Sequence, residues 1–289
     1  MMEINAKNAG TLTLGDKTFN RLGYGAMQLP GKGVWGPSRD SKNAVAVLRR
    51  AVELGVNFID TADAYGPFTA NLLIREAFAP YKDKYKNVFI STKVGFTRQG
   101  PDKWIPVGRP EYLRQEVEMN LRTLVVDKID LLFLHRIDPK VSVADQVGEL
   151  AKMQQEGKIS HIGLSQVSVA QIKEASKYAK IEAVQNLYNV TNRKDEDVLS
   201  YCEAHQIIFV PWFPLATGAL AKPGSVLDGL AKKHQASPSQ IALAWLLKRS
   251  PVILPIPGTS NLDHLEQNVA ATNVNLTDED VAAINALKS

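Results

Sequence analysis

A closed barrel of eight parallel strands, surrounded by helices, is the fold class that the sequence predicts. Strand-like apolar runs alternate with amphipathic helix-like stretches about every 30 residues, roughly the length of one strand–helix–strand unit. Eight such repeats favour closure into a (β/α)8 TIM barrel over an open, doubly wound sheet. Three of the strand-like runs also end in side chains suited to proton chemistry, as strands of an enzymatic barrel do.

The expected strands are short and apolar, and a hairpin precedes them. The hairpin has strands at Thr11–Leu14 and Lys17–Phe19, joined by the polar turn Gly15-Asp16. The barrel strands are expected near Leu22–Met27, Asn57–Thr61, Val88–Val94, Ile129–His135, Ile159–Ser165, Ala183–Gln185, Ile207–Pro211 and Val252–Ile256.

Helices are expected between the strands, where apolar residues recur at helical spacing. The first of them ends at the stop signal Gly55. A helix at Thr277–Leu287 follows the last repeat and begins with an acidic cap region. No shift in composition marks a linker, so residues 1–289 are expected to form one domain. The helices of the repeats are expected near Asn43–Leu54, Thr69–Phe78, Pro110–Leu124, Val143–Glu156, Val169–Ala179, Glu196–His205, Pro238–Arg249 and Leu262–Ala271.

The composition is that of a globular protein, with 45% hydrophobic residues among 289. The net charge of +4 is spread along the chain, so no nucleic-acid partner is expected. The apolar runs are shorter than the roughly 18 residues that span a bilayer, and the N-terminus lacks a signal-peptide core. The single cysteine, Cys202, excludes an internal disulfide and predicts a buried, inert thiol. We therefore expect a cytoplasmic protein with no membrane partner and no bound metal.

Four side chains at strand ends are the most informative feature of the chain. One apolar strand ends at Asp60 and is followed in the next loop by Tyr65, and two later strands end at Lys93 and His135. A free phenol, with a pKa of about 10, is a poor acid at neutral pH, and a nearby ammonium lowers that pKa. Tyr65 would then be a general acid, with Lys93 to tune it and Asp60 to hold the lysine. His135 would orient the oxygen of a carbonyl substrate.

The same residues resemble the signature segments of a known family. Phe58-Ile59-Asp60-Thr61-Ala62-x-x-Tyr65, Ser91-Thr92-Lys93 and Leu132-x-Leu134-His135 are similar to three segments of the aldo-keto reductase superfamily. The similarity spans essentially the whole chain. It implies a (β/α)8 barrel and an NAD(P)H-dependent reductase, in which hydride passes from the nicotinamide to an aldehyde or ketone. It assigns the four residues the same roles.

Other segments resemble the parts of that family that hold the nicotinamide. Ser165 is expected to bind the carboxamide, and Gln166 occupies the position of the usual asparagine. Gln185, in a Val-Gln-Asn segment, is expected to bind the same group. Trp212 is expected to stack on the nicotinamide ring, a position at which the potassium-channel β-subunit branch also has tryptophan.

The rest of the cofactor is expected to contact three loops. Lys222 resembles a lysine that the channel-related branch places on the pyrophosphate. The loop after the eighth strand opens a helix N-terminus, where barrels commonly bind phosphate. Relatives often carry basic residues near Ser260 and His264 for the 2′-phosphate, and this chain lacks them, so NADPH is expected with NADH also possible. The expected contacts outside the nicotinamide site are Met27, Asp60, Pro214, Leu215, Gly218, Lys222, Gly258, Thr259, Ser260, His264, Gln267 and Asn268.

Loop aromatics are expected to surround the substrate, which favours an apolar or planar carbonyl compound. Arg21–Met27 and the segment 255–259 resemble bacterial oxidoreductases and the pyridoxal-reductase group, so pyridoxal is one candidate. The expected substrate-binding residues are Trp35, Tyr65, Phe96, Trp104 and His135.

Two other classes of function remain open on the sequence alone. One is a redox-sensing, NADP(H)-binding regulatory subunit similar to the channel β-subunits, which Trp212 and Lys222 favour and the complete set of four residues disfavours. The other is a Schiff-base lyase or aldolase, because barrels with a strand-end lysine host that chemistry. It requires an uncharged lysine, whereas Asp60 would keep Lys93 charged.

Overall fold

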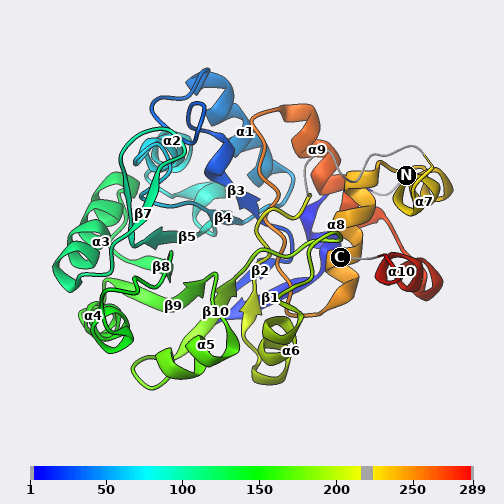
Figure 1. Ribbon diagram of the computed structural model, residues 1–289. Coiled ribbons are helices and arrows are strands. Elements are labelled where there is room, and N and C mark those ends of the chain that lie inside the picture. Colours follow the sequence, from blue (N-terminus) through cyan, green and yellow to red (C-terminus); the bar gives the residue numbers. More distant parts are fainter. Residues whose placement is uncertain (1–2, 216–223, 288–289) are drawn as a thin grey trace.

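The computed structural model describes residues 3–215 and 224–287, and a curved parallel sheet lies at its centre (Figure 1). Seven strands form the sheet in the order β11-β10-β9-β8-β5-β4-β3, and each neighbouring pair is parallel. The strands are β3 (Tyr24–Gly25), β4 (Phe58–Asp60), β5 (Phe89–Val94), β8 (Ile129–Leu134), β9 (Ile159–Ser165), β10 (Ile181–Gln185) and β11 (Ile208–Phe209).

The segment 252–256 closes the sheet into a barrel between β11 and β3. On one side the backbone of Phe209 exchanges two hydrogen bonds of 2.9 Å with residues 252–254. On the other side the N–H of Gly23 donates to the carbonyl of Pro255, also at 2.9 Å. The segment expected to form the eighth strand therefore occupies the eighth position around the barrel. It forms only an isolated bridge because Pro255 has no N–H to donate to a ladder.

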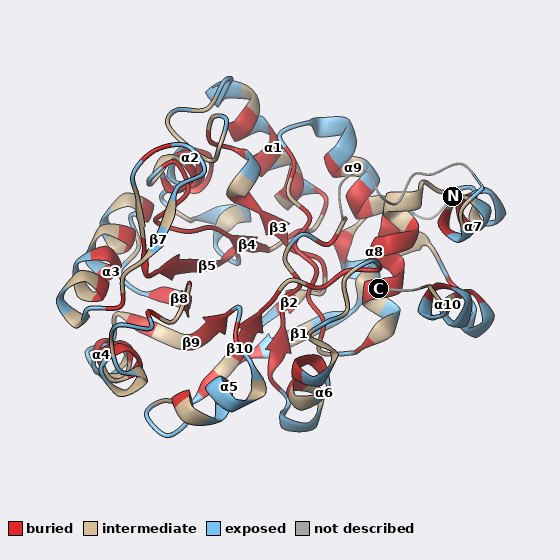
Figure 2. Cartoon of the chain, viewed as in Figure 1, coloured by how far each residue is buried: buried red, intermediate tan, exposed pale blue. Residues whose placement is uncertain are grey.

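Helices cover the outside of the barrel, and their buried faces turn toward the strands (Figure 2). The outermost two, α7 and α10, contact α8 rather than the strands (Figure 1). Within the described parts of the chain, no helix combines the length and the apolar content needed to cross a membrane. The helices are α1 (Ser41–Glu53), α2 (Thr69–Phe78), α3 (Pro110–Leu124), α4 (Val143–Gln155), α5 (Val169–Ala175), α6 (Glu196–His205), α7 (Val226–His234), α8 (Pro238–Arg249), α9 (Leu262–Ala270) and α10 (Asp278–Asn285).

An N-terminal hairpin closes one end of the barrel, the end at which the strands begin, which we call the lower end. It packs Phe19 against both Phe58 and Phe89, with ring centroids 5.0 and 4.8 Å away, and those two rings stack on each other at 5.2 Å. The hairpin also bonds to Asn57 and Asp130, which lie at the N-terminal ends of β4 and β8. The opposite end of the barrel is therefore the open one. The hairpin strands are β1 (Thr11–Leu14) and β2 (Lys17–Asn20).

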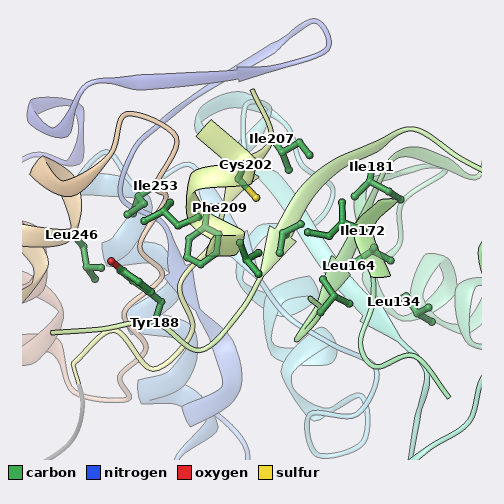
Figure 3. Packing of buried hydrophobic residues seen from close by; sticks show 14 of the residues in the cluster. Leu134, Leu164, Ile172, Ile181, Tyr188, Cys202, Ile207, Phe209, Leu246 and Ile253 are labelled. Carbon is green, nitrogen blue, oxygen red and sulfur yellow. The ribbon is translucent and has the colours of Figure 1, made fainter. Parts of the chain in front are cut away.

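A second apolar layer fills the space between the strands and the helices. Figure 3 shows part of it, where Leu164 and Phe209 on the strands lie near Ile172 and Cys202 on the helices. The sequence-based prediction that Cys202 is buried is confirmed, and burial raises the pKa of its thiol to about 12. The thiol is therefore uncharged and unreactive at neutral pH.

The predicted elements agree with the structure in their order, but several differ in their bounds: β3 covers only two residues of the predicted strand Leu22–Met27, because Ala26–Gln28 form a 3-10 helix, and β11 is shorter than the predicted strand Ile207–Pro211. α2, α3, α6, α8 and β9 have the predicted bounds, whereas α5 ends four residues early, at Ala175 rather than at Ala179. The hairpin of β6 (Phe96–Arg98) and β7 (Trp104–Pro106) was not predicted, because its strands are three residues long and pair only with each other. α7 was also missed.

Replacing Phe19 by alanine is expected to lower the free energy of unfolding by about 3–5 kcal/mol, because it leaves a cavity beside the stacked rings of Phe58 and Phe89. Urea denaturation would measure the loss. Thr13→Ala, at an exposed position of the same hairpin, serves as the control and should change stability by less than about 0.5 kcal/mol. Equal effects of the two variants would show that the packing of Phe19 against Phe58 and Phe89 does not stabilise the barrel.

Candidate active site

Four polar side chains meet at the open end of the barrel. Asp60 is the last residue of β4, Lys93 is the penultimate residue of β5, and His135 follows β8. Tyr65 comes from the loop between β4 and α2. The parallel registers of β4 with β5 and of β5 with β8 set these strand ends side by side. The structure therefore brings together the four residues that the sequence singled out.

Lys93 and Asp60 form a fully buried ion pair. The Nζ atom of Lys93 donates to Oδ2 of Asp60 at 2.5 Å and to the carbonyl of Thr61 at 2.8 Å. The second carboxylate oxygen of Asp60 accepts hydrogen bonds from Ser91 Oγ at 2.7 Å and from Gln185 Nε2 at 3.1 Å. Both charges thus have several partners, which offsets the cost of removing them from water.

The ammonium of Lys93 stays charged in this environment. Burial acts to lower the pKa of Lys93, but the charges of Asp60 and Tyr65 and the hydrogen bonds to them outweigh it. The net pKa of Lys93 is therefore raised above its usual value. A Schiff base requires a free amine, so this direction disfavours aldolase or lyase chemistry.

Tyr65 lies directly beside the ammonium, with Lys93 Nζ 5.0 Å from the centre of its ring. Burial raises the pKa of Tyr65, and the charge of Lys93 offsets only part of that shift. The sequence indicated only the lowering effect of Lys93, because burial of the phenol depends on the packed structure. The net pKa of Tyr65 is raised, so the phenol carries its proton at neutral pH.

His135 packs among aromatic rings. The centroid of its imidazole lies 4.6 Å from that of Phe96, 6.0 Å from that of Tyr65 and 6.2 Å from that of Trp104. Burial lowers the pKa of His135 well below its usual value, and the positive charge of Lys93 lowers it further. The imidazole is therefore neutral, and a neutral imidazole can donate one hydrogen bond.

Two cavities open beside these four residues and share one wall. The larger has a volume of about 400 Å³ and the smaller about 120 Å³. Met27, Tyr65, Gln185 and Trp212 line both. The larger cavity is also lined by Val34, Phe96, Asp102, Trp104, His135, Arg136 and Ser165. The smaller is also lined by Gly25, Gln28, Asp60, Phe213, Pro214, Leu215, Ile256, Pro257 and Gly258.

Of the residues expected at the nicotinamide, Gln185 and Trp212 lie on this shared wall, Ser165 lines only the larger cavity, and Gln166 lines neither. Ser165 and Gln185 are buried, and Trp212 lines both cavities. Gln166 is exposed and lines neither cavity; its Oε1 atom accepts a hydrogen bond from Trp212 Nε1 at 3.0 Å. Gln166 therefore contacts the indole from outside both cavities.

The loop after residue 256 approaches the smaller cavity closely. A Cβ atom on Gly258 would lie 2.5 Å from the carbonyl oxygen of Gly25, so only glycine fits there. Thr259 is buried, and Asn261 caps the N-terminus of α9 by accepting from the N–H of His264 at 3.0 Å. The remaining residues of the predicted contact set divide into exposed Ser260, His264 and Gln267 and buried Asn268. The predicted contacts Gly218 and Lys222 lie outside the described residues.

Phe96 and Trp104 form part of the wall of the larger cavity, as expected for substrate-binding residues. Trp35 does not reach that wall, and its neighbour Val34 lines the cavity instead. Trp35 lies in the adjacent loop, where its backbone forms an isolated parallel β-bridge with Gly66. The sequence identified this loop, but the side that faces the cavity depends on the local turn.

An acidic pair behind this wall was not anticipated from the sequence, although Asp63 follows Asp60 by three residues. Asp63 and Glu116 line a separate cavity of about 230 Å³ together with Phe96 and Tyr112. Asp63 is 1% exposed, and neither of its carboxylate oxygens has a hydrogen-bond partner within the described parts of the chain. Burial, and then the negative charge of Glu116, raises the pKa of Asp63 well above its usual value.

Asp63→Asn is expected to gain stability relative to the wild type as the pH rises. A carboxyl whose pKa is raised by folding adds no penalty below its ordinary pKa near 3.8, and it destabilises the fold as the pH rises through its folded pKa. Asparagine does not ionise, so the Tm difference should grow from about pH 4 toward pH 8. Thermal unfolding would measure it, with exposed Asp127→Asn as the control. A pH-independent difference would contradict the raised pKa.

Comparison with known proteins confirms the resemblance drawn from the strand-end motifs. A model of the aldo/keto reductase family matches residues 21–289. An uncharacterised oxidoreductase of Schizosaccharomyces pombe is 53% identical over 276 residues, which cover 96% of this chain and 89% of that protein. The pyridoxine 4-dehydrogenase of Escherichia coli is 44% identical over 286 residues, which cover 97% of this chain and 99% of the relative.

The solved structures agree with the sequence relatives. The crystal structure of an aldo-keto reductase from Klebsiella pneumoniae in complex with NADPH superposes with a TM-score of 0.78 at 25% identity. The match covers 93% of this chain and 90% of that one. The chain therefore belongs to the aldo/keto reductase family, and it is an oxidoreductase acting on carbonyl or alcohol groups.

Proposed function

We propose that the protein is an NADP(H)-dependent reductase of aldehydes or ketones, with Tyr65 as the general acid. The observation that carries the proposal is the buried Lys93–Asp60 pair beside Tyr65, at the wall between two cavities. The smaller cavity would hold the nicotinamide end of the cofactor, and the larger would hold the substrate. NADP(H) supplies the hydride when it is bound, and the protein supplies the proton.

The residues around the smaller cavity fit a nicotinamide nucleotide. Trp212 offers a flat indole and Gln185 an amide on the wall of this cavity, and Ser165 adds a hydroxyl from the wall of the adjoining larger cavity. Gly258 lines the same cavity as Trp212 and packs its backbone closely against Gly25, which brings the loop that precedes α9 to the cavity wall. The capped N-terminus of α9, which begins after Asn261, offers backbone N–H groups for phosphate oxygens.

Proton delivery follows from the electrostatics of the same group of residues. The Tyr65 phenol is protonated at neutral pH, so it can donate its proton to the developing alkoxide. The phenolate left behind is stabilised by the adjacent ammonium of Lys93, which Asp60 holds in place. Neutral His135 supports the acid by donating a hydrogen bond to the carbonyl oxygen, which orients the substrate.

The substrate is proposed to be a planar aromatic aldehyde, of which pyridoxal is one example. Rings of Phe96, Trp104 and His135 line the larger cavity. Its volume of about 400 Å³ is suited to a small ring compound. The 44% identity to a pyridoxine 4-dehydrogenase supports the same class of substrate.

NADPH is proposed as the preferred cofactor, with the 2′-phosphate near the exposed side chains of Ser260 and His264. The NADPH complex of the related Klebsiella pneumoniae reductase supports this choice. The sequence offers no arginine near Ser260 or His264 to form a bidentate clamp, so we expect a modest preference over NADH.

Tyr65→Phe is expected to lower kcat for aldehyde reduction by roughly 10²- to 10⁴-fold, because it removes only the proton donor. Affinity for NADPH, measured by quenching of tryptophan fluorescence, should change little. Tyr178→Phe, at an exposed tyrosine, is the control and should retain turnover. Near wild-type turnover by Tyr65→Phe would refute the general-acid role. Nucleotide binding without turnover by the wild type would favour a redox-sensing subunit instead.

Ser260→Asp is expected to weaken NADPH binding by about tenfold or more, because the new carboxylate would repel the 2′-phosphate. Binding of NADH, which lacks that phosphate, should be nearly unchanged. Ser260→Ala separates the loss of a hydrogen bond from repulsion and should have the smaller effect. Fluorescence titration would give the dissociation constants of the wild type and both variants for each nucleotide. Equal weakening for both nucleotides would place the 2′-phosphate elsewhere.

A further inference from the structure

We propose that Arg136 binds an anionic oxygen, a carboxylate or a phenolate, carried by the same molecule as the reacting carbonyl. This inference rests on the proposed function and narrows its substrate class. Arg136 directly follows His135 at the end of β8 and lines the larger cavity together with Tyr65 and Phe96. Its guanidinium carbon lies 5.4 Å from the centre of the Phe96 ring.

The guanidinium of Arg136 is held at one end and free at the other. Its Nη1 atom donates to the carbonyl of His135 at 2.6 Å and to Ser165 Oγ at 3.0 Å. Its Nε and Nη2 atoms donate to no residue of the segments 3–215 and 224–287, and no carboxylate there forms an ion pair with it. The two bonds of Nη1 fix the orientation of the planar guanidinium, and Nε and Nη2 remain available to a ligand.

A second arginine at the same end of the barrel shows the contrasting arrangement. Arg98 also has no ion pair in the described segments, but its donors bond to five backbone carbonyls, those of Gly33, Val34, Ala64, Gly100 and Lys103. Each side-chain nitrogen of Arg98 is therefore bonded within the protein. Arg136 has only two acceptors in the described segments, both on Nη1, so its Nε and Nη2 donors are available to a ligand in the cavity.

The charge of Arg136 also lacks compensation. Burial lowers the pKa of Arg136, because the surrounding protein solvates the charge less well than water does. A partly desolvated cation without a counter-ion is costly, and an anion that binds beside it recovers that cost. The low polarity of the Phe96 and Trp104 walls strengthens such an interaction.

The position of Arg136 assigns the anion to the substrate rather than to the cofactor phosphates. Arg136 lines the larger cavity, whereas Gly258 and Pro214 line the smaller one, toward α9. Among the described residues that line the larger cavity, Asp102 is the only one with a carboxylate, and it would repel an anion placed near it. The anionic group therefore belongs at the side of Arg136, with the carbonyl at Tyr65 and His135.

The test compares matched substrates in the wild type, Arg136→Met and Arg136→Lys. The charged probes are the carboxybenzaldehyde isomers, and their methyl esters are the neutral probes. Hydroxybenzaldehydes and their methoxy analogues, assayed below and above the pKa of the phenol, distinguish a phenolate from a carboxylate. The wild type should prefer one charged class, and Arg136→Met should lower the ratio of kcat/KM for charged over neutral probes by about 10- to 100-fold. Arg136→Lys should restore part of the preference.

Three results would overturn the inference. One is a wild type that reduces charged and neutral aldehydes equally well, which leaves the reductase function intact. Another is a charge preference that survives in Arg136→Met. The third is an equal loss for both probe classes together with weaker NADPH binding, which would make Arg136 a structural support for Ser165. The exposed Arg122→Met variant controls for the change in net charge and should keep the wild-type ratio. A protein that binds NADPH but reduces none of the aldehydes would instead contradict the proposed function.

Discussion

Two opposite charges, on Lys93 and Asp60, face each other at the centre of the barrel mouth with almost no exposure to solvent. Removal of one partner would leave the other unpaired in a poorly solvating environment, at a typical cost of about 3–5 kcal/mol. Ser91 and Gln185 complete the hydrogen bonds of the carboxylate. The pair also fixes an ammonium beside Tyr65, and this lysine offsets part of the effect of burial on the phenol. The geometry of the candidate site therefore depends on this interaction.

The barrel accommodates this buried pair because its aromatic packing and its polar site lie at opposite ends of the strands. The lower end is filled by Phe19, Phe58 and Phe89 and closed by the hairpin, so the apolar core does not depend on the polar end. At the open end, parallel strands deliver residues from distant parts of the chain to one edge. The loops that follow these strands then form the two cavities.

The two arginines of the open end show how surroundings decide the role of a residue type. All three side-chain nitrogens of Arg98 donate to backbone carbonyls, and these hydrogen bonds connect three loops. Arg136 lines the larger cavity, and of its nitrogens only Nη1 is hydrogen-bonded within the described parts of the chain. The difference lies in the acceptors within reach, which makes Arg98 a scaffold residue and Arg136 a candidate for substrate recognition.

The sequence by itself determined the order of strands and helices and the strand-end positions of Asp60, Lys93 and His135, because local periodicity and short motifs carry that information. Only the tertiary structure decided which groups lose water and which distant groups meet. Burial raises the pKa of Tyr65 despite the adjacent lysine, and Gln166 supports the indole from outside the cavities. Contacts of this kind join residues far apart in the chain, and their energies depend on packing that no local pattern encodes.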